Sequence, residues 1–372
     1  MKKIYLGLAA IALMAVLAGC GIQNTNQQQT AKEPIKIGVS LPLTGASAFI
    51  GNSYLDGLKM AQSEINKAGG INGRQVDLIL EDNQNLAKEG INSLNALLLK
   101  DPQLIISTMS VPSVAISPLV RELGKPLLVS MVFADIVSKN ENAVSFFPRT
   151  ADDAAAIVPA MLKNDVKTVG VIYLNTEYGK ASFDGFKAAA EKAGIKIVAV
   201  ESFLGDTTDY ATPLLKLKQK NPEAIYVIAI NAIPVVKNIK SNNIKAAIYN
   251  NLIPVFGSLV YKDPVTFEGT YLTAPKVAIA GTPEYETFRA KATANGIKLE
   301  NNSLGYTSVA YDNLQSISKI FANDSDPKNF VSNFSKLGQM NGVNGNYDLT
   351  GRDVGMPVYP VKMENGKLVE IK

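Results

Sequence analysis

The chain has 372 residues, of which 47% are hydrophobic, so it is long enough to form two domains with substantial cores. Its formal charge is only +4 and no basic block occurs, which argues against a nucleic-acid-binding protein. It has no histidine and one cysteine, Cys20, which excludes Ser-His and Cys-His catalytic pairs, histidine metal sites and internal disulfides. The sequence therefore predicts no catalytic site, no cofactor and no metal.

The N-terminus predicts export and a membrane anchor. Residues 1–19 have the layout of a secretory signal peptide, because a basic start is followed by an almost wholly apolar run at 4–16. The stretch "LAGC" resembles the bacterial lipobox, which implies a lipid on the Cys20 thiol after cleavage. Residues 20–33 are rich in Gln, Asn and Thr and predict a flexible tether. We therefore expect an extracytoplasmic protein, anchored by lipid to the bacterial cell membrane.

From residue 35 onward, short β-rich runs alternate with amphipathic helical stripes. Strands are predicted to begin near 36, 76, 104 and 126, and again near 168, 196, 224 and 247. Alternation of this kind implies parallel sheets that helices cover on both faces. Because the pattern restarts near 168, we expect an α/β fold of two doubly wound lobes.

The last hundred residues indicate how the lobes are joined. Two further helices are expected near 283–295 and 308–321, and Asn365-Gly366 suits the type I′ turn of a closing hairpin. Chain crossings between the lobes are expected at "FFPRTADD", "YLTAPK" and "NGNYDL". The expected lobes are residues 34–148 plus 276–345, and residues 149–275 plus 346–372. A ligand would lie between them, at the carboxyl ends of the parallel strands.

Two long stretches resemble a known family. The segment "IKIGVSLPLTGASAFIGNSYLDGLKMAQSEINKAGGINGRQVDLILEDNQN" is similar to the opening of type I periplasmic binding proteins, in particular the branched-chain amino acid receptors of ABC importers. The segment "KTVGVIYLNTEYGKASFDGFKAAAEKAGIKIVAVESF" resembles the start of their second lobe, and "DTTDYATPLLKLKQKNPEAIYVIA" continues it. The resemblance implies a two-lobed clamp with a multi-strand hinge that delivers a small solute to a permease.

The resemblance also implies which first-lobe residues contact the ligand. In "STMSVPS", Ser110 matches the family's carboxylate-binding serine, although a shift to Ser113 stays open, and the helix N-terminus there suits an anion. In "SMVFAD", Ser130, Phe133 and Ala134 fall in the next pocket loop. Ala134 stands where the family has a threonine hydroxyl. Phe133 makes the wall bulkier, unless it packs inside the lobe.

Aromatic residues are expected to cover the ligand. Tyr178 in "NTEYGK" matches a family tyrosine whose ring covers the ligand, with packing inside the lobe as the alternative. Phe49 or its neighbour Ile50, in "GASAFIG", lies where the family often has an aromatic lid residue.

The second lobe departs from the family where a ligand ammonium would need an acid. The family's glutamate position holds Leu252, in "YNNLIP". The adjacent Asn251, and Asn231 in "IAINAIP", offer uncharged polar groups instead. Three loop acids are weaker substitutes: Asp135, Glu177 and Asp206.

The expected function is therefore a solute-binding lipoprotein rather than an enzyme. Its ligand is either a branched-chain or other apolar amino acid, or a related carboxylate without an amine. Its expected partners are ABC importer permease subunits. A sensor subunit that reports ligand occupancy to a membrane receptor is the alternative. A hydrolase is the third hypothesis, but it would have to use a Ser-Lys pair, since no Gly-x-Ser-x-Gly elbow occurs.

Overall fold

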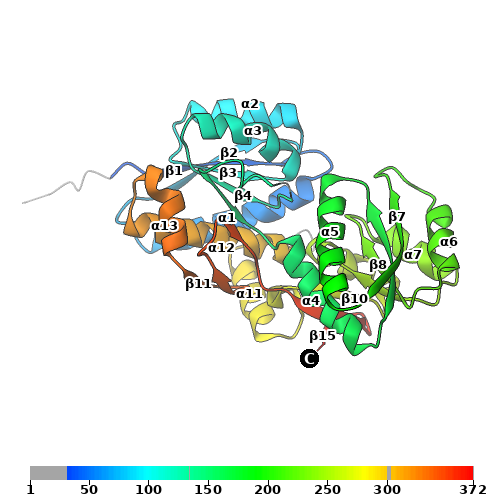
Figure 1. The fold of residues 1–372 in the computed structure, drawn as a ribbon. Helices are drawn as coiled ribbons and strands as arrows, with labels where there is room; N and C mark the ends of the chain where they lie inside the picture. Colours follow the sequence, from blue (N-terminus) through cyan, green and yellow to red (C-terminus); the bar gives the residue numbers. More distant parts are fainter. Residues whose placement is uncertain (1–31, 134, 300–302, 372) are drawn as a thin grey trace, which may run out of the picture. The chain divides into compact units, whose positions relative to one another are not determined.

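A computed structural model describes residues 32–133, 135–299 and 303–371 of the chain (Figure 1). Both predicted lobes belong to one compact unit, Glu33–Lys372. The predicted signal peptide and Cys20 lie outside the described residues.

The first lobe is built on a six-stranded sheet in the order β13-β5-β4-β3-β1-β2, in which every neighbouring pair is parallel. Four of its strands begin within one residue of the predicted positions. The apolar runs of β1, β3 and β4 are buried because helices cover both faces of the sheet, whereas only Val76 is buried in the edge strand β2. The strands are β1 (Ile35–Leu41), β2 (Val76–Asp82), β3 (Leu104–Thr108), β4 (Leu127–Ser130), β5 (Ala143–Phe146) and β13 (Asp353–Val354).

The second lobe is built on a seven-stranded sheet in the order β15-β14-β10-β9-β8-β6-β7. Its five strands from β10 to β7 are parallel, while β14 and β15 are antiparallel additions at one edge. The strands are β6 (Thr168–Leu174), β7 (Lys196–Phe203), β8 (Ala224–Ile228), β9 (Ala247–Asn250), β10 (Tyr271–Ala274), β14 (Tyr359–Glu364) and β15 (Lys367–Glu370). The predicted turn joins β14 to β15, and its two residues have φ of 52° at Asn365 and 73° at Gly366.

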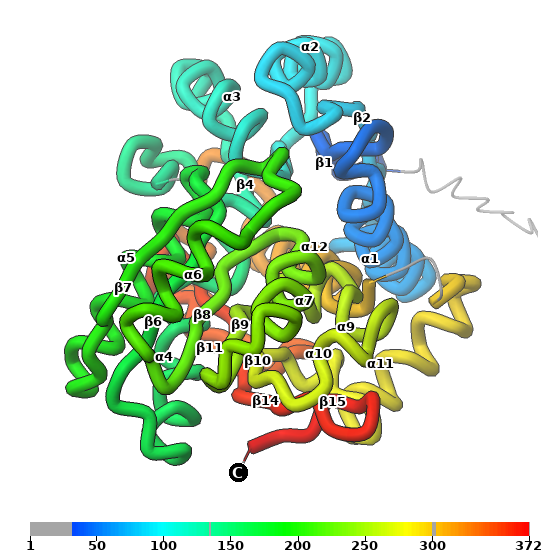
Figure 2. The backbone as a smooth tube through the Cα atoms, turned by 90° about the vertical axis from the view of Figure 1, so that its right-hand side faces the viewer, coloured from blue at the N-terminus to red at the C-terminus, as the bar shows by residue number. Residues whose placement is uncertain are grey.

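Helices cover both faces of each sheet (Figures 1 and 2). In the first lobe, α1 (Ala48–Lys67) packs along α12 (Leu304–Asn323), while α2 (Ala87–Leu98) and α3 (Ser110–Glu122) pack together and form a separate core with β3 and β4. In the second lobe, one face carries α4 (Thr150–Lys163) and α5 (Glu177–Lys192), and the other carries α6 (Ala211–Gln219) and α7 (Ile233–Ser241). The two α/β lobes that the alternation predicted are confirmed.

The remaining elements are short or lie late in the chain. Three single-turn helices follow β9: α8 (Ile253–Phe256), α9 (Leu259–Lys262) and α10 (Pro264–Phe267). After β10 come η1 (Lys276–Ala278), α11 (Pro283–Ala294), η3 (Pro327–Asn329) and α13 (Phe330–Lys336). The strands β11 (Gln339–Gly342) and β12 (Gly345–Asp348) form a separate hairpin.

The chain passes between the sheets three times. It leaves the first sheet after β5, returns after β10, and leaves again between β13 and β14. The first two crossings match the prediction, but the third lies at 355–358 and not in "NGNYDL". The strand β13 has only two residues, so it carries no periodic signal, and its surroundings "TGRDVGMP" resemble a turn.

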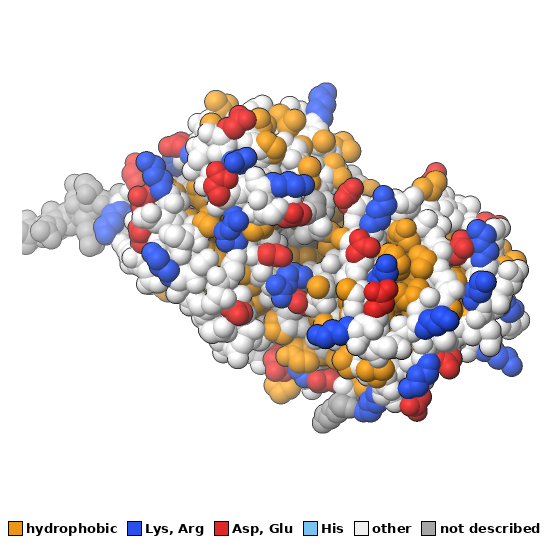
Figure 3. All heavy atoms as spheres, in the orientation of Figure 1, with side chains coloured by type: hydrophobic (Ala, Val, Ile, Leu, Met, Phe, Trp, Pro, Cys, Tyr) orange, Lys and Arg blue, Asp and Glu red, His pale blue; other side chains and the backbone are white. Residues whose placement is uncertain are grey.

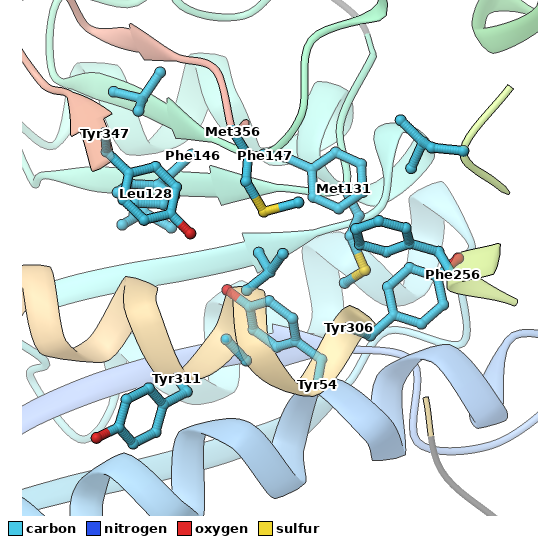
Figure 4. Packing of buried hydrophobic residues seen from close by; sticks show 14 of the residues in the cluster. Tyr54, Leu128, Met131, Phe146, Phe147, Phe256, Tyr306, Tyr311, Tyr347 and Met356 are labelled. Atoms are coloured by element: carbon cyan, nitrogen blue, oxygen red, sulfur yellow. The ribbon is translucent and has the colours of Figure 1, made fainter. Parts of the chain in front are cut away.

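Buried aromatic rings connect the lobes near the crossings (Figure 4). Phe147, in the first crossing, has its ring centroid 5.7 Å from that of Phe256 in α8. Phe256 in turn lies 5.3 Å from Tyr306 of α12. Edge-to-face rings of this kind add about 0.5–1.5 kcal/mol each beyond the area that they bury. The hinge region is therefore packed with side chains rather than open.

Candidate functional site

The candidate site lies where the parallel strands of both sheets end. The loops after β1, β3 and β4 in one lobe, and after β6, β8 and β9 in the other, leave the carboxyl ends of the strands. Ligands of open α/β sheets bind at these ends. Among the described residues predicted to bind the ligand, Ser130 is the last residue of β4, and the others belong to these loops or to the helices that follow them.

Ser110 opens α3 in a geometry suited to an anion. The preceding residue, Met109, has φ 72° and ψ 143°, a conformation that costs a non-glycine residue about 1–3 kcal/mol. The Ser110 hydroxyl accepts a hydrogen bond from the backbone N–H of Phe133 at 3.0 Å, which leaves its own hydrogen for another acceptor. No side chain among the described residues caps α3. The N–H groups of Ser110 and Val111 therefore remain for an anion, while Pro112 has no N–H and the N–H of Ser113 donates to the carbonyl of Met109 at 3.2 Å.

The alternative serine faces the interior of the first lobe. Ser113 is fully buried, and its hydroxyl is hydrogen-bonded to that of Ser107 at 2.7 Å. This arrangement favours Ser110 as the residue that meets a ligand.

Ser130 also lies inside the lobe. Its hydroxyl donates to the carbonyl of Phe146 at 3.1 Å and accepts from the amide of Asn313 at 3.2 Å. The side chain is completely buried, so it supports the strand end instead of facing a ligand. Ala134, predicted next to it, lies outside the described residues.

Phe133 and Tyr178 meet across the two lobes. Their ring centroids are 4.6 Å apart, although Phe133 follows β4 of the first sheet and Tyr178 begins α5 of the second lobe. The ring centroid of Phe133 also lies 5.8 Å from that of Phe147, and the Phe133 side chain is half-buried. It therefore packs partly inside the lobe and remains partly available as a wall of the site, the two alternatives that the sequence left open. The pair forms an aromatic contact between the strand ends of the two sheets.

Asn251 fixes the hydroxyl of Tyr178. The Asn251 amide donates a hydrogen bond to the Tyr178 hydroxyl, and both side chains are buried. Burial raises the pKa of Tyr178 well above its usual value, so the hydroxyl stays protonated. Asn231, the other predicted amide, is exposed after β8. The structure thus brings Asn251 and Tyr178 together, whereas Asn231 lies exposed at the surface.

Phe49 contacts the other lobe through a cation. It lies in the first turn of α1, half-buried, and the ammonium of Lys262 in α9 sits 4.3 Å from its ring centroid. Sequence reasoning named Phe49 but missed Lys262.

The three predicted acids are exposed. Asp135 accepts hydrogen bonds from the hydroxyl and the backbone N–H of Ser138, which lower the pKa of its carboxyl. Glu177 and Asp206 lie at the surface. Leu252, at the family's glutamate position, is 3% exposed.

A buried carboxylate that the sequence did not single out lies behind this region. Asp153, in the first turn of α4, accepts hydrogen bonds from the Thr273 hydroxyl and from the backbone N–H of Leu252, the latter at 3.3 Å. Burial raises its pKa to about 7, and these two donors offset only part of that effect. The sequence feature that could have indicated Asp153 is its position in the "FFPRTADD" crossing. Acidic residues are common in the first turn of a helix, however, so this position alone did not distinguish it.

Two open hollows lie near the crossings, and the smaller one also borders the loop that follows β4. One of about 530 Å³ is lined by Arg149, Asp152 and Asp353 among others, and one of about 240 Å³ lies beside Phe133 and Phe147. In the first hollow, the Arg149 guanidinium already donates hydrogen bonds to the Asp152 carboxylate, so these two groups satisfy each other. On the face that Figure 3 draws, acidic and basic side chains are interspersed, without a large region of one sign.

The comparison with protein families shows to which family the chain belongs. A model of the periplasmic binding protein family matches residues 34–367. The chain belongs to this family. The resemblance that the sequence suggested is therefore confirmed, and with it the two-lobed fold. Among the described residues, no helix has the length and apolarity needed to cross a bilayer.

Individual relatives are distant. A "Leu/Ile/Val-binding protein homolog 3" of Brucella melitensis is 31% identical over 196 residues, which are 52% of this chain and 53% of that protein. The chain thus spans about half the length of this relative. An "Amino acid binding protein" of Pseudomonas aeruginosa is 26% identical over 88% of this chain and 87% of its own.

Solved structures agree on the fold. A Streptococcus pneumoniae branched-chain amino acid transporter substrate-binding protein in complex with isoleucine has a TM-score of 0.75 at 21% identity, covering 90% of this chain and 97% of its own. A Rhodopseudomonas palustris solute-binding protein in complex with benzoate has a TM-score of 0.74 at 17% identity, covering 91% and 95%.

Proposed function

We propose that this protein is a solute-binding lipoprotein that captures a small amphipathic ligand between its lobes and delivers it to an ABC importer permease. The observation that carries the proposal is the meeting of Ser110, Phe133 and Tyr178. A hydroxyl at an uncapped helix N-terminus supplies a carboxylate site, and the two rings supply an apolar wall.

The ligand class follows from these groups and from the names of the relatives. A carboxylate would bind at Ser110 and the first turn of α3, and an apolar body would bind against Phe133 and Tyr178. The relatives include proteins named for Leu, Ile and Val binding, and structures that hold isoleucine or benzoate. The proposed ligand is therefore an apolar amino acid or a related carboxylate. Asn251 acts through the Tyr178 hydroxyl, and Phe49 covers the entrance.

Location and partner are part of the same proposal. Cys20 carries the lipid, residues 20–33 form the tether, and the permease receives the ligand from the clamp. A sensor that reports the same ligand to a membrane receptor remains the second candidate, because it would use the same clamp. The proposed lobes are residues 34–148 plus 276–345 and residues 149–275 plus 346–372, with β13 as an exception that joins the first sheet.

A thermal-shift screen tests the ligand class. The panel contains leucine, isoleucine, valine and phenylalanine, the deaminated acid of each, benzoate, and the neutral amides as controls. A true ligand at about 100 times its Kd stabilises the protein by about 2.7 kcal/mol, which raises the Tm by several degrees. Stabilisation by a carboxylate but not by its amide supports the proposal. A panel without any stabilising carboxylate contradicts it.

The ligand must also be recovered unchanged. Turnover of a bound compound, followed by chromatography, would support a hydrolase instead. To separate import from sensing, uptake of the radiolabelled ligand is compared between wild-type cells and cells that lack the protein.

A further inference from the structure

The contact between Lys262 and Phe49 joins the two lobes at a second point. The ammonium lies 4.3 Å from the ring centroid, within the range of about 6 Å in which a cation is attracted to an aromatic face. Figure 2 shows α9, which ends at Lys262, next to α1, which begins beside Phe49. The two residues are far apart in sequence, so their contact depends on how the lobes are held together.

Both residues belong to connections that leave strand ends. Phe49 follows the carboxyl end of β1, and Lys262 follows the carboxyl end of β9 by way of α8. The candidate residues Ser110, Phe133 and Tyr178 also follow carboxyl ends, of β3, β4 and β6. The contact therefore lies on the same side of the two sheets as the candidate site.

The charge of Lys262 is not neutralised by a neighbouring acid in the described part of the chain. The next residue, Asp263, forms an ion pair with Lys237, with 2.7 Å between the ammonium and the carboxylate. Among the described residues, Lys262 forms no ion pair within 4.0 Å, and its side chain is exposed. A cation on a ring face is held weakly, so a ligand carboxylate is a stronger partner for it.

We propose that Lys262 closes on Phe49 at the mouth of the ligand site and selects for ligands of net negative charge. This inference rests on the proposed function, since it requires a ligand at Ser110 and Tyr178. An exposed cation within a Debye length of about 8–10 Å attracts an anion and leaves a zwitterion almost unaffected. The favoured ligand is therefore a carboxylate without an amine, and not the amino acid of the same skeleton.

Calorimetric titration of the full chain tests the selection. The probes are 4-methylpentanoate and leucine, which share a skeleton and differ in charge, with benzoate and phenylalanine as a second pair. In the wild type, each anion is expected to bind more tightly than its zwitterion at low salt. Lys262→Met is expected to weaken the anions about two- to fivefold and leave the zwitterions unchanged. Lys262→Arg is expected to retain anion affinity, because a guanidinium keeps both charge and ring contact.

The matched control is Lys237→Met. It removes the same charge from the same lobe, at a lysine whose charge Asp263 already offsets. Equal losses in Lys237→Met and Lys262→Met, equal losses for anion and zwitterion, or tighter wild-type binding of leucine would each overturn the selection while the proposed function stands. Binding of neither member of either pair would contradict the proposed function instead.

The contact itself is tested without a ligand. Phe49→Leu, Lys262→Met and the double variant form a double-mutant cycle, read out by the Tm. A formed contact makes the two losses non-additive by roughly 1–2 °C. Additive losses would show that the ring and the ammonium do not meet in solution, and the proposal would fall.

Discussion

The carboxylate of Asp153 accepts a hydrogen bond from the backbone N–H of Leu252 at 3.3 Å, across 99 residues of sequence. Leu252 begins the turn into α8, and the preceding Asn251 holds the hydroxyl of Tyr178. Asp153 therefore fixes the turn on which the Tyr178 contact depends. A change of charge at Asp153 should therefore alter both the free energy of unfolding and the affinity for the ligand.

Asp153→Asn should change how stability depends on pH. The folded-state pKa is about 7, raised from an ordinary value of 3.8, so the folded protein binds a proton that the unfolded chain releases. The stabilising contribution of Asp153 is complete below about pH 4 and is lost as the pH rises to about 7, by at most roughly 4 kcal/mol. Asp153→Asn lacks this loss. Its unfolding free energy should therefore increase relative to that of the wild type between pH 5 and pH 8.

Urea denaturation at pH 5, 6.5 and 8 measures the difference. Asp152→Asn is the control, because Asp152 is a neighbouring surface acid that pairs with Arg149. A difference between wild type and Asp153→Asn that is the same at all three pH values contradicts the prediction.

Asp153 also tests the competing view of the ligand. If a ligand ammonium uses this carboxylate, Asp153→Asn should lose leucine binding and keep 4-methylpentanoate binding. If the ligand has no amine, calorimetry should show 4-methylpentanoate binding in the variant, and leucine should bind equally weakly to both proteins.

Ser110→Ala should weaken carboxylate binding by about 10- to 100-fold, because it removes a hydrogen bond to a charged group that is worth about 1.5–3 kcal/mol. Its Tm should change little, since Ser110 is only half-buried. Ser113→Ala provides the opposite control: it breaks the buried bond to Ser107, so it should lower the Tm and leave the Kd unchanged. Reversed effects would move the carboxylate site to Ser113.

Phe133→Ala should enlarge the site. The substitution removes the ring contacts with Tyr178 and Phe147, and it leaves space that a bulkier ligand body can fill. We expect the variant to gain affinity for a naphthoate relative to benzoate in calorimetric titration. An unchanged ratio of the two affinities would mean that Phe133 does not line the site.

Asp312→Ala should loosen the β11–β12 hairpin. Asp312 in α12 accepts hydrogen bonds from the Tyr347 hydroxyl at 2.6 Å, the Val343 N–H at 3.0 Å and the Asn344 amide at 3.1 Å, and its side chain is buried. Loss of the shared acceptor should cost about 2–4 kcal/mol in unfolding free energy. Hydrogen exchange across 339–348 should speed up as well. The exposed Asp348→Ala, in the same hairpin, should cost less than about 1 kcal/mol, and a similar loss there would contradict the argument.

The strand pattern was predictable because parallel strands buried on both faces give apolar runs that periodicity detects. The run "LIIST" is an example, since all five residues of β3 are buried. The two-residue β13 and the single-turn helices α8–α10 gave no such signal. Their conformations depend on neighbours far away in the sequence.

The sequence named Ser110 and Tyr178 through the family resemblance, and the structure has both in the first turns of helices, α3 and α5. Their contact with a ligand stays a prediction. Ser130 was assigned to the ligand, but its strand end turns the hydroxyl inward to Phe146 and Asn313. Asp153 and Lys262 depend on contacts across about 99 and 213 positions, which no local pattern encodes.

The contact between Phe133 and Tyr178 has a practical consequence for optical spectroscopy. The chain has 14 tyrosines and no tryptophan, so no indole absorbs the energy that a tyrosine would emit. A ligand that separates the two rings, or that breaks the bond from Asn251 to the Tyr178 hydroxyl, changes the surroundings of one chromophore in a weakly emitting background. If the ligand binds beside Tyr178 as proposed, tyrosine fluorescence should report occupancy, and comparison with a Tyr178→Phe variant isolates the contribution of this residue.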